Sequence, residues 1–224
     1  MKLRKLLQSL VVVTALCVSA TTLHAEGLNI FAMGSVSSLF DSHNYTEYST
    51  PFGSAYKTGG GFTLGVEAPL GKILAVEGAY SNVRNNLAIT DFGTSVVTGY
   101  GIHNQRISGD AVAHAPRSFL GLKPYLAAGL EYDRWSKVGP YSGIFSDFVN
   151  APFGAANKVG VNYGGGVDMN LLPHIALRVD VRDHLTGTPT YGFPSSPSNG
   201  PYFPVSGAAH DLEDSAGIVV HLGK

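Results

Sequence analysis

Beyond residue 25, short segments of the chain alternate apolar and polar residues, as expected of β-strands whose two faces differ. The clearest segment, residues 175–182, reads Ile-Ala-Leu-Arg-Val-Asp-Val-Arg, so that every second side chain is aliphatic. The same alternation marks residues 62–70, 74–81, 125–133, 159–169 and 215–222, and more weakly residues 28–32 and 107–113. The pattern therefore predicts eight strands.

The connections between these segments are alternately short and long. Tight turns rich in Pro and Gly lie at residues 69–73, 116–123 and 170–174. Long connections rich in Tyr, Ser, Asn and Gly cover residues 41–57, 84–105, 136–157 and 185–208. Membrane barrels show this asymmetry, with short turns on the inner side and long loops outside. The sequence thus predicts an all-β fold, an eight-stranded antiparallel up-and-down transmembrane β-barrel.

The two faces of these segments indicate which side meets the membrane. One face is apolar, and the other holds small residues interrupted by isolated charges. A soluble barrel would turn its apolar face inward, but the charges here are too sparse to coat a solvated exterior. The interior of an eight-stranded barrel is only wide enough for side chains to fill, so small residues and paired charges suit it. The apolar face is therefore expected to face lipid, within a closed sheet that leaves no backbone group unpaired in hydrocarbon.

The lumen is expected to hold an ion-pair network. A three-residue turn at residues 71–73 would place Glu67 opposite Glu77. Two facing carboxylates repel one another and require a cation between them. We expect a hydrogen-bonded network that plugs the lumen, made of Glu67, Glu77, Glu131, Asp168, Asp180, Arg178 and Arg182. Alternatively, Asp168 and Arg182 lie at strand ends in water.

A plugged lumen would exclude a general porin, which requires a wider barrel of about 16 to 18 strands. Three aromatic residues at the long-loop ends of strands are expected to form an interfacial girdle, namely Tyr80, Tyr132 and Trp135. The alternative is that tyrosine is simply common in strands.

The N-terminal segment has the three parts of an export signal. Lys2, Arg4 and Lys5 precede an apolar stretch at residues 10–20, and Leu23-His24-Ala25 precedes the expected cleavage point. We expect a signal peptide at residues 1–25 and a barrel domain at residues 26–224. Cleavage after Ala20 and an uncleaved membrane anchor are the alternatives.

Charge and cysteine content narrow the chemistry further. The single cysteine, Cys17, lies in the expected signal, so the mature chain would contain no thiol. Removing the three basic residues of the signal leaves 12 basic against 16 acidic residues, a net charge of about −4. No basic run is present, which argues against nucleic acid as a partner. The histidines beyond the signal do not show the spacing of a metal site or catalytic triad, so no enzymatic activity, metal or cofactor is expected.

Two local patterns resemble the small outer-membrane β-barrel domains of the OmpA/OmpX type. Residues 124–132, Pro-Tyr-Leu-Ala-Ala-Gly-Leu-Glu-Tyr, are similar to the fifth strand of that family. Residues 177–183, followed by Leu185-Thr186-Gly187, are similar to the seventh strand as it enters the last long loop. The resemblance implies a bacterial outer-membrane location, contact with outer-membrane lipid and insertion by the barrel-assembly machinery. It also implies a structural or surface-interaction role without enzymatic activity.

The long loops are the expected place for such interactions. Candidate contacts with a host, phage or envelope molecule are Tyr45, Tyr48, Phe145, Phe148, Tyr191 and Tyr202. Two alternatives remain, a soluble periplasmic barrel that binds a small apolar ligand and a lipid-modifying outer-membrane enzyme.

Overall fold

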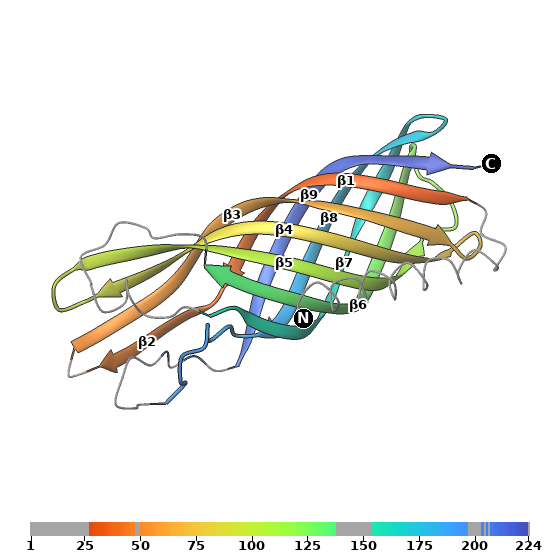
Figure 1. Cartoon of the computed structure of the whole chain (residues 1–224). Coiled ribbons are helices and arrows are strands. Elements are labelled where there is room, and N and C mark those ends of the chain that lie inside the picture. The colour runs from red at the N-terminus through yellow and green to blue at the C-terminus, as the bar shows by residue number, and fades with distance from the viewer. Residues whose placement is uncertain are drawn as a thin grey trace.

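The computed structural model describes residues 27–47, 50–137, 154–196, 203, 205 and 207–223, and the expected signal peptide lies outside these ranges. Antiparallel strands account for most of the described chain (Figure 1). The strands are β1 (Leu28–Phe40), β2 (Ser42–Glu47), β3 (Thr50–Pro69), β4 (Leu74–Asp91), β5 (Val96–His114), β6 (Leu122–Lys137), β7 (Ala156–Leu172), β8 (Ile175–Gly187) and β9 (Ala208–Leu222). Within these residues, no helix is both long enough and apolar enough to cross a membrane.

The sheet closes because β1 pairs with both β3 and β9. β1 and β2 are two parts of one strand that is interrupted at Asp41, and both pair with β3. The closed barrel therefore has eight strands. Following paired residues once around the barrel from Ile30 leads back to β1 at Phe40, ten residues farther along the strand. With a rise of about 3.3 Å per residue and strands about 4.8 Å apart, this stagger corresponds to a strand tilt of about 40°. The predicted fold is confirmed.

The strands are longer than the sequence pattern indicates. β4 and β5 stay paired from Leu74 and Ala113 to Asp91 and Val96, so the expected long connection at residues 84–105 is mostly strand. The connection expected at residues 41–57 likewise contains the β2–β3 hairpin. Figure 1 shows β3, β4 and β5 running beyond the barrel, with β2 alongside β3. Outside the membrane both faces of a strand can be polar, so the alternation fades while the backbone pairing continues.

The predicted polarity of the barrel is confirmed. Leu64 and Val179 point outward, with 48% and 49% of their surfaces exposed, whereas Glu67 and Arg178 are buried inside. The predicted register is also confirmed, because Glu67 pairs with Glu77. A barrel that binds an apolar ligand in its lumen would need the opposite polarity, so the soluble alternative is wrong.

An apolar cluster closes the long-loop end of the lumen. Inward-facing residues of several strands, including Leu87, Ile102 and Trp135, pack with Tyr191 and Phe203 from the connection between β8 and β9. The hydroxyl groups of Tyr56 and Tyr191 lie 2.7 Å apart. This connection therefore folds back over the barrel opening.

Candidate functional site

The interior between the apolar cluster and the tight turns is filled by charged side chains. Each of nine buried carboxylates contacts at least one of three buried arginines. The arginines are Arg106, Arg178 and Arg182, and the carboxylates are Glu67, Glu77, Asp110, Glu131, Asp133, Asp168, Asp180, Asp211 and Glu213. Asp168 and Arg182 are buried, so the alternative that places them in water at strand ends is wrong.

Of the three buried arginines, Arg178, on β8, lies nearest the tight turns. Its Nε atom lies 2.7 Å from Asp168, its Nη2 atom 2.9 Å from Glu67 and its Nη1 atom 3.1 Å from Glu77. The two glutamates face each other across β3 and β4, so this guanidinium offsets the repulsion between them.

Two aromatic rings enclose the same guanidinium. The centroids of Phe31 and Tyr125 lie 5.2 Å and 4.6 Å from the Arg178 Cζ atom, within the range of cation–π attraction. Glycines make room for both rings. A Cβ atom at Gly65 would lie 2.2 Å from the Phe31 ring, and one at Gly166 would lie 2.6 Å from the Tyr125 hydroxyl oxygen. These inward-facing glycines therefore serve packing around Arg178.

Arg182 lies two inward positions farther along β8, with the inward-facing Asp180 between it and Arg178. Its Nη2, Nη1 and Nε atoms contact Glu77 at 2.7 Å, Asp110 at 2.8 Å and Asp180 at 2.9 Å. Glu77 thus contacts both Arg178 and Arg182 and joins the two groups into one network.

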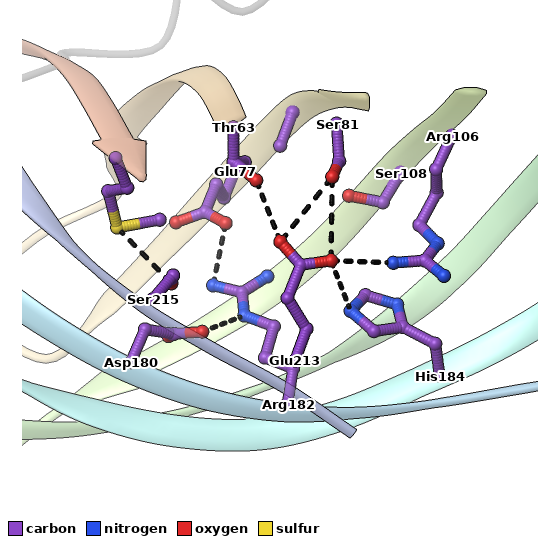
Figure 2. Close-up of a pocket in the computed structure, with 12 residues that line it drawn as sticks. Thr63, Glu77, Ser81, Arg106, Ser108, Asp180, Arg182, His184, Glu213 and Ser215 are labelled. Carbon is purple, nitrogen blue, oxygen red and sulfur yellow. Dashed lines mark hydrogen bonds and ion pairs between the residues drawn. The ribbon is translucent and has the colours of Figure 1, made fainter. Parts of the chain in front are cut away.

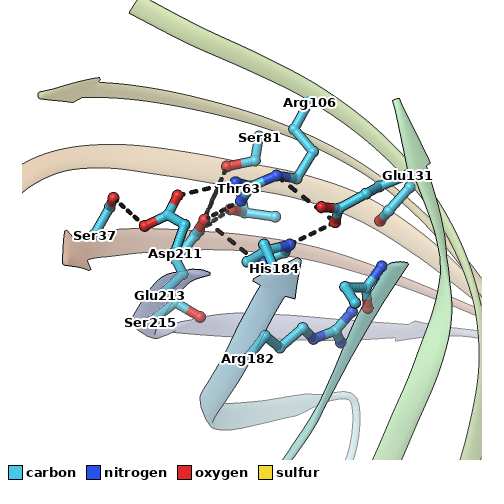
Figure 3. A network of polar contacts seen from close by, with 12 residues as sticks. Ser37, Thr63, Ser81, Arg106, Glu131, Arg182, His184, Asp211, Glu213 and Ser215 are labelled. Atoms are coloured by element: carbon cyan, nitrogen blue, oxygen red, sulfur yellow. Dashed lines mark hydrogen bonds and ion pairs between the residues drawn. The ribbon is translucent and has the colours of Figure 1, made fainter. Parts of the chain in front are cut away.

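Arg106, on β5, organises the end of the network closest to the apolar cluster (Figure 3). Its guanidinium contacts Asp211 at 2.9 Å, Glu213 at 2.9 Å and Asp133 at 3.0 Å, and lies 3.7 Å from Glu131. Four carboxylates therefore share one buried cation in this part of the lumen.

Neutral donors and a histidine complete the contacts around Arg106. The Nδ1 atom of His184 lies 2.6 Å from Glu131, and its Nε2 atom lies 3.8 Å from Glu213. The hydroxyl group of Thr63 donates a 2.9 Å hydrogen bond to Glu213. A cavity of about 20 Å³ remains between the groups around Arg106 and Arg182 (Figure 2), which is room for about one water molecule.

The structure brings all seven residues of the expected network into the lumen, but not all of the acids contact the arginines that were expected. Glu131 contacts His184 and the Arg106 group rather than Arg178 or Arg182. Sequence reasoning missed half of the network, namely Arg106, Asp110, Asp133, Asp211, Glu213, His114 and His184. Extending the alternation of β5 by one residue, and that of β9 by four, would have placed Arg106, Glu213 and Asp211 inside.

The aromatic predictions have mixed outcomes. Tyr80 and Tyr132 lie on the outer face. The girdle assignment of Trp135 is wrong, since its side chain is 1% exposed and packs in the apolar cluster, with its ring 6.3 Å from that of Tyr56. Trp135 has the same parity as the inward-facing Asp133, so its alternation already indicated burial.

The loop-contact assignment of Tyr191 is also wrong, because its side chain is 0% exposed and belongs to the same cluster. Tyr45 lies in β2, where only its backbone is described. Four other expected contacts lie outside the described residues, namely Tyr48, Phe145, Phe148 and Tyr202. Within the described ranges, no group of three or more His, Cys, Asp or Glu side chains could hold a metal ion.

Comparison with known proteins agrees with this architecture. Neisserial surface protein A (NspA) superposes with a TM-score of 0.55 at 16% identity, over 88% of this chain and 97% of NspA. OprG of Pseudomonas aeruginosa gives a TM-score of 0.55 at 11% identity, over 90% of this chain and 98% of OprG. At these identities the similarity shows the fold. No curated protein sequence matches the chain.

A family model covers most of the sequence. The model of the outer membrane protein beta-barrel domain matches residues 9–203. The family, the closed barrel and its outward apolar face together place the protein in the bacterial outer membrane. The chain belongs to the outer membrane protein beta-barrel domain family.

Proposed function

We propose that this protein is a closed, non-enzymatic barrel that acts at the outer surface of the cell, in a structural or surface-interaction role, rather than as a solute channel. The ion-pair network that fills the lumen is the observation that carries this proposal. The apolar cluster above the network adds a second barrier. The extensions of β2 to β5 beyond the barrel offer a surface for contacts.

The outer rim gives limited support to the enzymatic alternative. An outward-facing pair joins the Nδ1 atom of His210 to Asp183 at 2.9 Å, and the hydroxyl group of Tyr163 also donates to Asp183. A lipid hydrolase of the Ser–His–acid type needs a serine within hydrogen-bond reach of the histidine. Among the described residues, no serine hydroxyl hydrogen-bonds to His210. This arrangement favours a role without catalysis.

Liposome swelling tests the closed lumen. Liposomes that contain the folded protein should swell in isotonic arabinose no faster than protein-free liposomes, because the charged side chains leave no continuous path for a sugar. Heat-modifiable migration in detergent gels establishes that the inserted protein is folded. Swelling that increases in proportion to the amount of folded protein would show an open channel and overturn the proposal.

A further inference from the structure

The outer face of β4 to β6 changes character abruptly at the long-loop end of the membrane band. Tyr80, Ile107 and Tyr132 form one row of paired, outward-facing residues. The next outward row consists of Asn82, Gln105 and Arg134. Apolar and aromatic side chains thus give way to polar ones within one row, which marks the boundary between hydrocarbon and headgroups.

Four basic residues gather directly beyond this boundary, on four neighbouring strands. We call them the basic rim cluster, and its members are Lys57, Arg84, His103 and Arg134. Arg84 pairs directly with His103 across β4 and β5. Lys57, which pairs with Asn86, is a diagonal neighbour of Arg84, and Arg134, which pairs with Gln105, is a diagonal neighbour of His103.

The cluster is compact enough to contact one headgroup. Directly opposed residues on neighbouring strands lie about 5 Å apart and diagonal neighbours about 7–8 Å apart, distances that long side chains span. The tilt of the strands brings the four positions to a similar height above the hydrocarbon boundary. Long cationic side chains on such a surface can converge on a phosphate group.

The described part of the chain offers the cluster no acidic partner. Among the described residues, Lys57, Arg84 and Arg134 form no ion pair with a carboxylate, whereas every arginine in the lumen contacts at least three. Burial and the neighbouring Arg84 guanidinium lower the pKa of His103 below its usual value. The positive charges of Lys57, Arg84 and Arg134 together favour a bound anion.

The opposite side of the barrel lacks this positive charge. The outward-facing residues of β8 and β9 below the rim include two acids, Asp183 and Asp214. The Asp183 carboxylate already hydrogen-bonds to the Tyr163 hydroxyl group at 2.7 Å and to the His210 Nδ1 atom at 2.9 Å. The concentration of positive charge is therefore confined to β3 to β6 and does not extend around the whole rim.

We propose that the basic rim cluster binds the phosphate groups of a phosphorylated glycolipid headgroup in the outer leaflet. Arginine suits this ligand because its planar fork matches phosphate oxygens in a bidentate geometry. The aromatic row below the cluster lies where acyl chains meet the headgroup, so one lipid molecule can contact both rows. The site is independent of whether the lumen conducts solutes.

The test compares lipid binding by two charge-matched variants. The site variant is Arg84→Gln/Arg134→Gln, and the control is Lys72→Gln/Arg117→Gln, which removes the same charge from exposed positions in the tight turns. Native mass spectrometry in detergent would measure the fraction of each protein that retains lipid A over a concentration series. Since each basic residue near a lipid surface contributes about fivefold to affinity, the site variant should bind lipid A at least about tenfold more weakly than the wild type. The control should bind like the wild type.

Two further arms identify the ligand chemistry. Dephosphorylated lipid A should bind the wild type as weakly as intact lipid A binds the site variant, and inorganic phosphate equimolar with intact lipid A should not displace it. Equal lipid A affinity in the wild type and the site variant would overturn the proposal, as would tight binding of the dephosphorylated lipid or displacement by equimolar inorganic phosphate. Heat-modifiable migration establishes that each variant is folded, and the single substitutions Arg84→Gln and Arg134→Gln replace the double variant if it is not.

Discussion

Replacing Arg106 with methionine should lower the free energy of unfolding by about 5 kcal/mol, the upper part of the range for breaking a buried ion pair. Asp133 and Asp211 would lose the guanidinium, and no other cation lies within ion-pair distance of either among the described residues. Among the described residues, the two glutamates of the group would keep His184 as their only nitrogen partner, and Glu213 would also keep its hydrogen bond from Thr63. Methionine fills much of the same volume, so the loss should reflect uncompensated negative charge more than a cavity. Urea unfolding in lipid vesicles would measure this decrease in the free energy of unfolding.

A second set of substitutions separates charge from packing. In the Arg106→Met background, adding Asp133→Asn and Asp211→Asn should restore a large part of the lost stability, because the two carboxylates left without a cation become neutral amides. The exposed Arg117 supplies the matched control, since Arg117→Met should leave the urea midpoint nearly unchanged. If the two asparagine substitutions restore nothing, the loss comes from packing, and the electrostatic account of Arg106 is wrong.

Replacing Arg178 with methionine should cost less, about 3 kcal/mol. Asp168 would lose both of its hydrogen bonds to the guanidinium. The other two carboxylates retain partners, since Glu67 keeps His114 at 3.1 Å and Glu77 keeps Arg182 at 2.7 Å. The methionine side chain would also keep apolar contact with the two flanking aromatic rings. The same urea assay would measure the change.

The order of the two effects matters as much as their size. The contacts predict that the Arg106 variant is less stable than the Arg178 variant, because more carboxylates lose their cation around Arg106. An unchanged urea midpoint for Arg178→Met would remove this residue from the network. A reversed order would mean that the two aromatic rings, and not the carboxylates, dominate the contribution of Arg178.

The sequence predicted the fold well because the membrane imposes a strict pattern. Between the tight turns and the headgroup boundary, every outward position must be apolar or small, as in residues 175–182 on β8. The alternation there reports the direction of each side chain, so the polarity and the pairing of Glu67 with Glu77 followed from it. The alternation could not show where the strands end. Around Arg106 the neighbours Asn104 and Gln105 are both polar, and the alternation disappears while β5 continues.

The upper half of the lumen network was missed for the same reason. Asp211 and Glu213 precede the last segment that shows clear alternation, at a height where outward positions such as His210 and Asp214 are themselves polar. The burial of Tyr191 was still harder to predict from the sequence. It depends on the connection between β8 and β9 folding back onto Tyr56, a contact between residues 135 positions apart in the chain. No local pattern encodes such a contact.

The central claim is that the apolar faces meet lipid and the charged faces meet one another around the barrel axis. Fluorescence quenching by lipids brominated in their acyl chains tests it directly. In a Trp135→Phe background, which removes the single native tryptophan, the indole would be placed at Leu64, Val179 or Tyr125. Tryptophan at positions 64 and 179 should be strongly quenched, and tryptophan at position 125 should retain most of its emission. Strong quenching at position 125 with none at positions 64 and 179 would contradict the account.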